Sequence, residues 1–112
     1  MGIFLYRRRS PAGCKMKSAE KEITREKLEK YFKVTEKALS AAEKSGNRTG
    51  LVEEREDMLD IVSRYVSDAR HFYSKGDFVN AFACLNYAHG WLDAGARIGI
   101  FDVHDSGLFT AD

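Results

Sequence analysis

The segment from Gly76 to Ala94 constrains the fold most, because apolar residues occupy nearly every face of the helix that it predicts. Residues spaced three and four apart form one continuous stripe: Phe78, Ala81, Phe82, Leu85, Ala88 and Leu92. A helix that is apolar all round has to be covered on more than one side. The rest of the chain is polar enough to supply that cover, so we expect this helix to be the most buried one of a small bundle.

A second row of aromatic, soft or small side chains lies beside this stripe: Cys84, Tyr87 and Trp91, with Ala83 and Ala94. These groups would form an exposed apolar patch unless a second helix or a second subunit packed on them. Gly90 lies in the middle of the same helix, where a glycine costs about 1 kcal/mol relative to alanine. That cost indicates close approach of a partner helix or a small ligand. We therefore predict an interaction surface formed by Cys84, Tyr87, Gly90 and Trp91.

A thin polar strip, consisting of Asn86, His89 and Asp93, runs between the two apolar rows. His89 and Asp93 are four residues apart and can reach one cation, and Asp68 or His71 from the neighbouring helix can add a ligand. The alternative is structural, with these groups satisfying one another or the preceding helix at a helix contact. The spacing alone is a weak signal, so we favour the structural interpretation and keep the five residues as candidates for ligand binding.

Two further helices precede this one. The first is predicted from about Ser18 to the loop at residues 45–50, with Ser18 and Thr24 as alternative starts and a glycine cap at Gly46. Lys and Glu alternate along its polar face in the i to i+4 order that stabilises a helix. That pattern is typical of a solvated face.

The second helix is predicted to begin near Glu53 and Glu54, whose charges suit the N-terminal end of a helix. It ends in the segment 74–77, where Gly76 suits a left-handed cap and Asp77 suits the N-cap of the third helix. A break this short forces an antiparallel hairpin.

The third helix is expected to fray between Gly95 and Gly99, and the tail that follows is expected to be irregular. Several tail residues are too apolar for a free terminus, so part of the tail should fold back on the bundle: Ile100, Phe101, Val103, Leu108 and Phe109. The sequence therefore predicts an all-α protein, a three-helix up-and-down antiparallel bundle with an irregular C-terminal tail.

The length of 112 residues and the hydrophobic content of 44% are those of one folded domain, which we place at residues 18–112. Residues 1–17 carry five basic side chains and no acidic one, and we interpret them as a flexible basic extension, with Met16 as the expected natural start. A basic arm that binds nucleic acid or another anionic surface is the functional alternative for this segment. The remaining residues hold 13 basic and 17 acidic side chains, a balance that disfavours binding of a phosphate backbone.

The two cysteines, Cys14 and Cys84, lie far apart and neither belongs to a CxxC pair. Reduced thiols and a cytoplasmic location are therefore expected. No apolar run approaches the roughly 18 to 20 residues that a membrane-spanning helix needs, so no membrane partner is expected.

Two segments carry a resemblance to a known family: residues 68–78, and residues 81–94 with their run Asn-Tyr-Ala-His-Gly-Trp-Leu-Asp. The region from about Glu20 to Phe109 resembles an archaeal family of small helical proteins known as domain of unknown function 357. The resemblance implies a three-helix up-and-down bundle, an archaeal cytoplasmic setting and no established activity. It also suggests that some members lie beside a nucleotidyltransferase-like domain, for which this chain has no room and no phosphate-binding motif.

We therefore expect a non-enzymatic protein-interaction or self-association module, with a protein partner or a second copy as its partner and the third helix as its contact surface. The alternative is an accessory domain that binds a small nucleotide-like or metal ligand in the polar strip and serves a nucleotidyltransferase-type partner. No catalytic residue, cofactor or metal site is assigned. The sequence leaves catalysis open, with a non-enzymatic role favoured.

Overall fold

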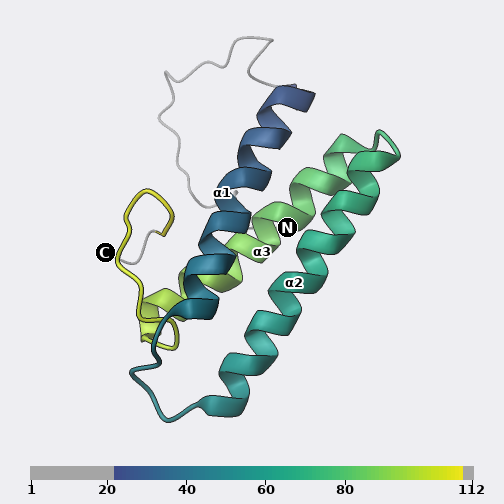
Figure 1. Cartoon of the computed structure of the whole chain (residues 1–112). Helices are drawn as coiled ribbons and strands as arrows, with labels where there is room; N and C mark the ends of the chain where they lie inside the picture. The colour runs from purple at the N-terminus through teal and green to yellow at the C-terminus, as the bar shows by residue number, and fades with distance from the viewer. Residues whose placement is uncertain (1–21, 110–112) are drawn as a thin grey trace, which may run out of the picture.

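The computed structural model describes residues 22–109, which form three helices (Figure 1). Helix α1 spans Arg25–Lys44, α2 spans Val52–Ser74 and α3 spans Phe78–Ile98. The helices run alternately down, up and down the molecule, and α3 makes its most extensive contact with α2. The predicted all-α three-helix bundle is confirmed. Within residues 22–109, no helix is long and apolar enough to span a membrane.

The starts of α1 and α3 follow from capping side chains. Thr24 caps α1, since its hydroxyl oxygen accepts a hydrogen bond from the Lys27 amide at 3.1 Å, so the later of the two alternative starts is the observed one. Asp77 caps α3 by accepting from the Asn80 amide at 3.2 Å, as predicted. Gly76 has a φ of 77°, which confirms the left-handed cap of α2. The basic extension at residues 1–17, with the expected start at Met16 and the helix start at Ser18, lies outside the described residues.

Two predicted helix ends are wrong. Helix α1 does not end on a left-handed Gly46; its C-cap is Ser45, with a φ of −79° and a hydroxyl that donates to the Ala42 carbonyl at 2.7 Å. Helix α3 does not fray at Gly95 but continues to Ile98, and Gly99 closes it with a φ of 88°. A hydroxyl that bonds the last turn therefore ends α1 where a glycine was expected to do so.

Gly95 lies inside α3 for a packing reason. It is buried, and a Cβ atom at this position would overlap the Phe101 ring and crowd the Met58 side chain. The Phe101 amide also donates to the Gly95 carbonyl at 3.2 Å, which turns the chain back against the helix end. Gly95 was expected to mark the fraying of α3. Its missing side chain instead leaves room for the Phe101 ring of the tail.

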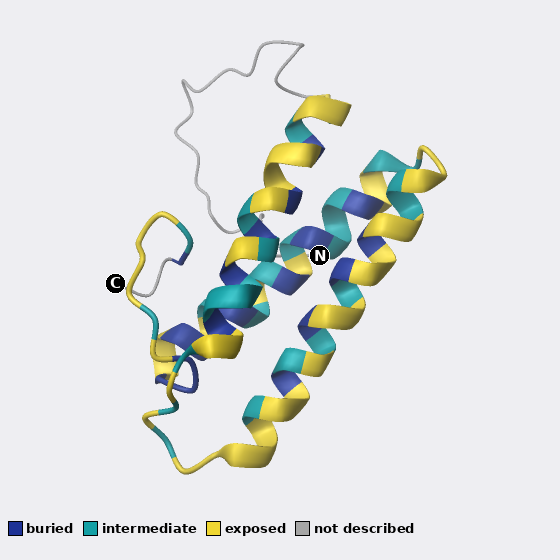
Figure 2. Cartoon of the chain, viewed as in Figure 1, coloured by how far each residue is buried: buried dark blue, intermediate teal, exposed yellow. Residues whose placement is uncertain are grey.

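The core lies between the three helices and extends under the tail (Figure 2). Four of the six residues of the predicted α3 stripe are buried: Ala81, Leu85, Ala88 and Leu92. Phe78 and Phe82 are only partly buried, because they lie at the edge of the bundle. The tail folds back as predicted, with its largest side chains fully enclosed: Ile100, Phe101 and Phe109.

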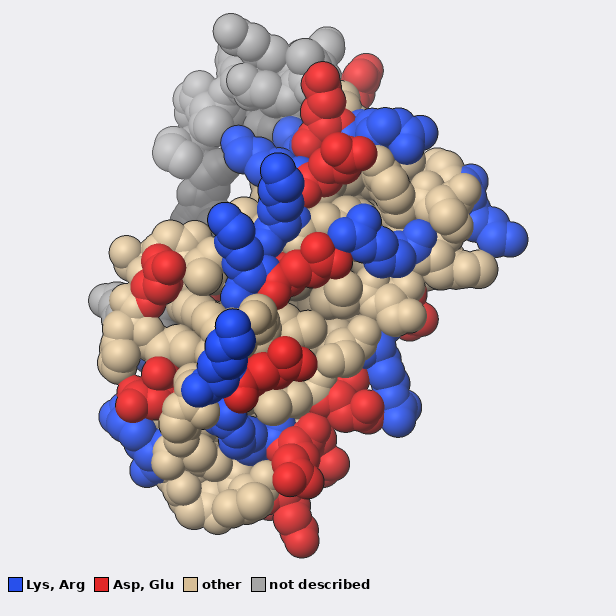
Figure 3. Space-filling model, in the orientation of Figure 1, with Lys and Arg blue, Asp and Glu red and all other residues tan. Residues whose placement is uncertain are grey.

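Charges of both signs lie along the surface of α1, where Lys and Arg lie beside Glu (Figure 3). Acidic side chains gather at the end of the molecule where α2 begins, and its first turn contains Glu53 and Glu54. The mixture of charges along α1 confirms the prediction that this side of α1 is a solvated face.

Candidate functional site

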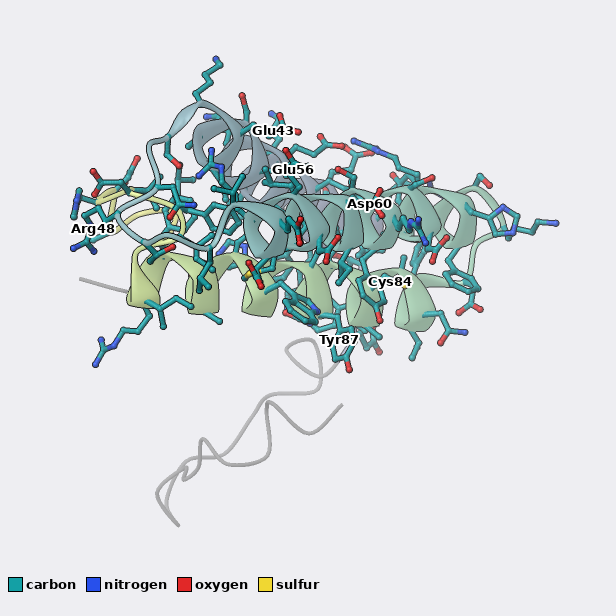
Figure 4. The ribbon with its side chains drawn as sticks, turned by 90° about the horizontal axis from the view of Figure 1, so that it is seen from below. Glu43, Arg48, Glu56, Asp60, Cys84 and Tyr87 are labelled. Atoms are coloured by element: carbon teal, nitrogen blue, oxygen red, sulfur yellow. The ribbon has the colours of Figure 1, made fainter. Side chains whose placement is uncertain are left out.

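The side of α3 that faces away from the other helices carries a row of uncharged side chains. We call this row the outer face of α3; it consists of Val79, Ala83, Tyr87, Gly90, Ala94 and Ile98. Three of its members are large and well exposed, with Val79 at 68%, Ile98 at 57% and Tyr87 at 44% of their full accessible surface. In the view of Figure 4, Tyr87 points away from the bundle.

Two shallow hollows meet at Tyr87 and Trp91. One, of about 280 Å³, is lined by Tyr87, Gly90, Trp91 and Ala94. The other, of about 370 Å³, lies on the boundary with α2 and is lined by Ile61, Arg64, Tyr65, Asp68, Tyr87 and Trp91. The two hollows make one continuous surface with α3 at its centre.

Tyr87 is held in place by an aromatic contact with α2. Its ring lies edge-on to that of Tyr65, with centroids 4.8 Å apart and an interplanar angle of 87°. Trp91 is partly buried beside the same contact, and Gly90 is exposed. Helix α2 therefore covers one flank of the predicted surface and leaves Tyr87 and Gly90 open to solvent.

Cys84 lies on the α2 side of this surface and is partly buried. Burial raises the pKa of its thiol, and the negative charges of Asp68 and Asp77 add to that rise. A raised pKa keeps the sulfur protonated near neutral pH, which is the opposite of what an activated nucleophile needs. The geometry gives Cys84 a packing role.

The polar strip faces α1 and the C-terminal tail. The Nε2 atom of His89 is 2.7 Å from the carbonyl oxygen of Leu108, and its Nδ1 atom is 3.4 Å from the Thr35 hydroxyl. Because a carbonyl oxygen can only accept, Nε2 carries the proton in the neutral ring and Nδ1 accepts from the hydroxyl. His89 therefore joins three separate parts of the chain.

The other two members of the strip have local partners. Asp93 lies one turn beyond His89, with its Oδ1 atom 3.7 Å from the His89 Nε2 atom. The side-chain amide of Asn86 donates to the Phe82 carbonyl of its own helix at 3.1 Å. The strip is thus engaged in contacts within the chain, but the partners of His89 lie in α1 and the tail and not in the preceding helix, α2, as the structural interpretation had expected. A ligand-binding role for the strip stays a prediction.

The structure does not bring Asp68 and His71 to the strip. Asp68 lies at the rim of the larger hollow, beside Tyr87 and Trp91. His71 is exposed in the last turn of α2, where its ring lies 5.8 Å from that of Phe72. Among the described residues, no three His, Cys, Asp or Glu side chains are grouped so that they could hold a metal ion.

Arg55 is a residue that the sequence analysis missed. Its guanidinium donates to the carbonyls of Ala42 at 3.0 Å and Ser45 at 2.7 Å, at the end of α1, and to that of Ile100 in the tail at 2.7 Å. The charge also lies 5.5 Å from the centre of the Phe101 ring. The available signal was a basic residue in the otherwise acidic first turns of α2, where its own helix dipole opposes it.

The described residues define an all-α protein, a three-helix bundle with a folded-back tail and an uncharged outer helix face. Residues 30–101 match the family described as "Protein of unknown function (DUF357)". The chain belongs to this family, as the resemblance of residues 68–78 and 81–94 suggested. Neither the search of curated proteins nor the search of solved structures finds a match.

Proposed function

We propose that the chain is a non-enzymatic protein-interaction module whose contact surface is the outer face of α3. The observation that carries the proposal is the exposure of Tyr87, held by Tyr65 above two adjoining hollows. Tyrosine is among the residues that most often dominate binding energy at protein interfaces, because its ring offers a large contact area with little conformational freedom to lose. Its fixed position here supports the same role.

Gly90 supports the proposal independently. A Cβ atom at Gly90 would meet no other atom within 4 Å, so nothing in the described chain requires a glycine there. The position nevertheless costs the helix about 1 kcal/mol relative to alanine. An external partner that packs closely on this point accounts for that cost.

The ligand-binding alternative draws less support from the geometry. Asn86 and His89 each donate a hydrogen bond to a backbone carbonyl of the chain itself. A ligand in the polar strip would have to replace these bonds before it gained any of its own. The interaction module requires no such exchange, because the outer face of α3 is already open.

The test is site-specific photo-cross-linking in cells that produce the chain. Benzoylphenylalanine replaces Tyr87 in one variant and the exposed Lys37 of α1 in a control. The proposal predicts discrete protein adducts from position 87, absent from position 37, that disappear when Gly90→Leu is added. Equal labelling from both positions, or no adduct from position 87, would overturn it.

A further inference from the structure

We infer that the partner of this surface is a second copy of the chain, packed with its α3 antiparallel to the first about a two-fold axis that passes between Tyr87 and Gly90. The inference rests on the proposed function and specifies its partner. It follows from the order of side chains along the outer face of α3.

The six residues of this face are spaced symmetrically. Successive members are four, four, three, four and four residues apart. This series reads the same in both directions, and its centre lies midway between Tyr87 and Gly90. When a second copy of the helix lies antiparallel to the first, each of the six residues therefore lies at the same level as one of the six residues of the partner. This matching is the condition for an isologous contact.

The residues that meet in this way are complementary in size and polarity. Tyr87 comes to the level of the partner's Gly90, so that the bulkiest side chain of the row faces the position without one. Ala83 comes to the level of the partner's Ala94, and Val79 to that of the partner's Ile98. None of the six residues is charged, so the two-fold axis brings no like charges together on this face.

In a parallel arrangement each residue would instead lie at the level of its own copy. Two Tyr87 rings would then meet at one level and two Gly90 positions at another, which would leave a clash beside a gap. The antiparallel arrangement removes both, since large and small groups alternate across the contact.

The available area fits a weak dimer. The outer face of α3 is about 28 Å long and about 10 Å wide, so two copies would bury about 600 Å² through α3 alone. Specific interfaces begin at about 1,200 Å², so the contact would also have to include the flank of α2 around Tyr65, which lies beside Tyr87 and Trp91. The charge of Arg64 at that rim is paired within the chain, with Asp60 at 2.9 Å.

Cysteine cross-linking tests this arrangement directly. In a Cys14→Ser, Cys84→Ser background, Ala83→Cys and Ala94→Cys are made separately and treated with a short bis-maleimide, alone and mixed. Position 83 faces position 94 of the partner, so linked dimers should form mainly in the mixture and be lost on adding Gly90→Leu. A third variant, Lys37→Cys, controls for random collision.

Two outcomes would overturn the inference. Strong linking of each variant to itself would indicate a parallel pair or a different register. A mixture that links no more than the Lys37→Cys control would mean that no such dimer forms. The proposed function would then stand or fall separately on the adducts from position 87, since those report any protein partner.

Discussion

The Nη1 atom of Arg55 donates a hydrogen bond to the carbonyl oxygen of Ile100 at 2.7 Å, across 45 residues of sequence. The same guanidinium bonds carbonyls at the end of α1, so one side chain holds the first turn of α2, the last turn of α1 and the start of the tail. Carbonyls in the last turn of a helix lack the amide partner that the next turn would supply, and a positive charge interacts favourably with them. This end of the bundle is fixed by Arg55.

Replacing Arg55 should therefore destabilise the fold far more than a surface charge would. Arg55→Ala is predicted to lower the free energy of unfolding by about 3 kcal/mol, because several partly buried carbonyls lose a charged donor. Arg55→Lys should recover less than half of this loss, since an ammonium cannot bond the same fork of carbonyls. Urea unfolding measures both. The control is Arg64→Ala, which removes an exposed ion pair and should cost under about 1 kcal/mol. If the two alanine variants lost the same free energy of unfolding, the role assigned to Arg55 would be contradicted.

Two glycines of α3 should respond to alanine in opposite directions. At Gly95 the added methyl group would overlap the Phe101 ring, so Gly95→Ala should destabilise the chain by about 1 to 3 kcal/mol. At Gly90 the methyl group meets nothing, and Gly90→Ala should stabilise the chain by up to about 1 kcal/mol. Urea unfolding at low protein concentration compares them without a contribution from association. Destabilisation by Gly90→Ala under these conditions would show that the monomer itself needs the glycine.

His89 should hold the tail against the bundle. His89→Ala removes the donor to the Leu108 carbonyl and leaves Thr35 without its ring partner, so it should lower stability by about 1 to 2 kcal/mol. It should also speed amide hydrogen exchange and proteolysis around Phe109, which lies beside the ring at 6.5 Å between centroids. His71→Ala is the control, because His71 is exposed. A His89→Ala variant with unchanged stability and tail exchange would remove the structural role and return the polar strip to the ligand hypothesis.

The thiol of Cys84 should react slowly. Burial and the charges of Asp68 and Asp77 raise its pKa, so less of it is thiolate at neutral pH than in an unfolded chain. In a Cys14→Ser background, alkylation by iodoacetamide should therefore be slower in the folded protein than in urea, and should accelerate as the pH rises toward the raised pKa. The neutral thiol is the favoured form, so its contribution to stability is complete below the unfolded pKa and lost above the folded one. Faster alkylation of the folded form than of the unfolded chain would contradict this environment.

The helices were predictable because their signals are local. The spacing of apolar residues in α3, the Asp77 cap and the left-handed Gly76 all act within a few residues of the chain. Of the two wrong helix ends, that of α1 has a local cause, the bond from the Ser45 hydroxyl to the Ala42 carbonyl three residues earlier, whereas that of α3 depends on the tail beyond the helix. Gly95 lies where it does because Phe101 packs on it, and a glycine in sequence looks the same whether it frays a helix or admits a ring.

The candidate site was predictable in part for the same reason. Spacing placed Tyr87, Gly90 and Trp91 on one surface, and the structure leaves Tyr87 and Gly90 open to solvent. Spacing could not show that His89 bonds Thr35 and Leu108, because those contacts cross 54 and 19 residues of sequence. The bridging role of Arg55 could not be predicted from the sequence for the same reason, because its partners belong to segments that only the folded chain brings together.

Self-association through the outer face of α3 can be measured as the molar mass of the full chain by light scattering over a wide range of protein concentration, for the wild type and for Tyr87→Asp. An antiparallel α3 dimer should raise the wild-type mass from 12.7 kDa toward twice that value as concentration increases, whereas Tyr87→Asp should remain at the monomer mass with its helical content unchanged. A wild-type mass that stays at 12.7 kDa at every concentration would contradict self-association through the outer face of α3. A dimer that Tyr87→Asp leaves intact would show that the copies meet elsewhere.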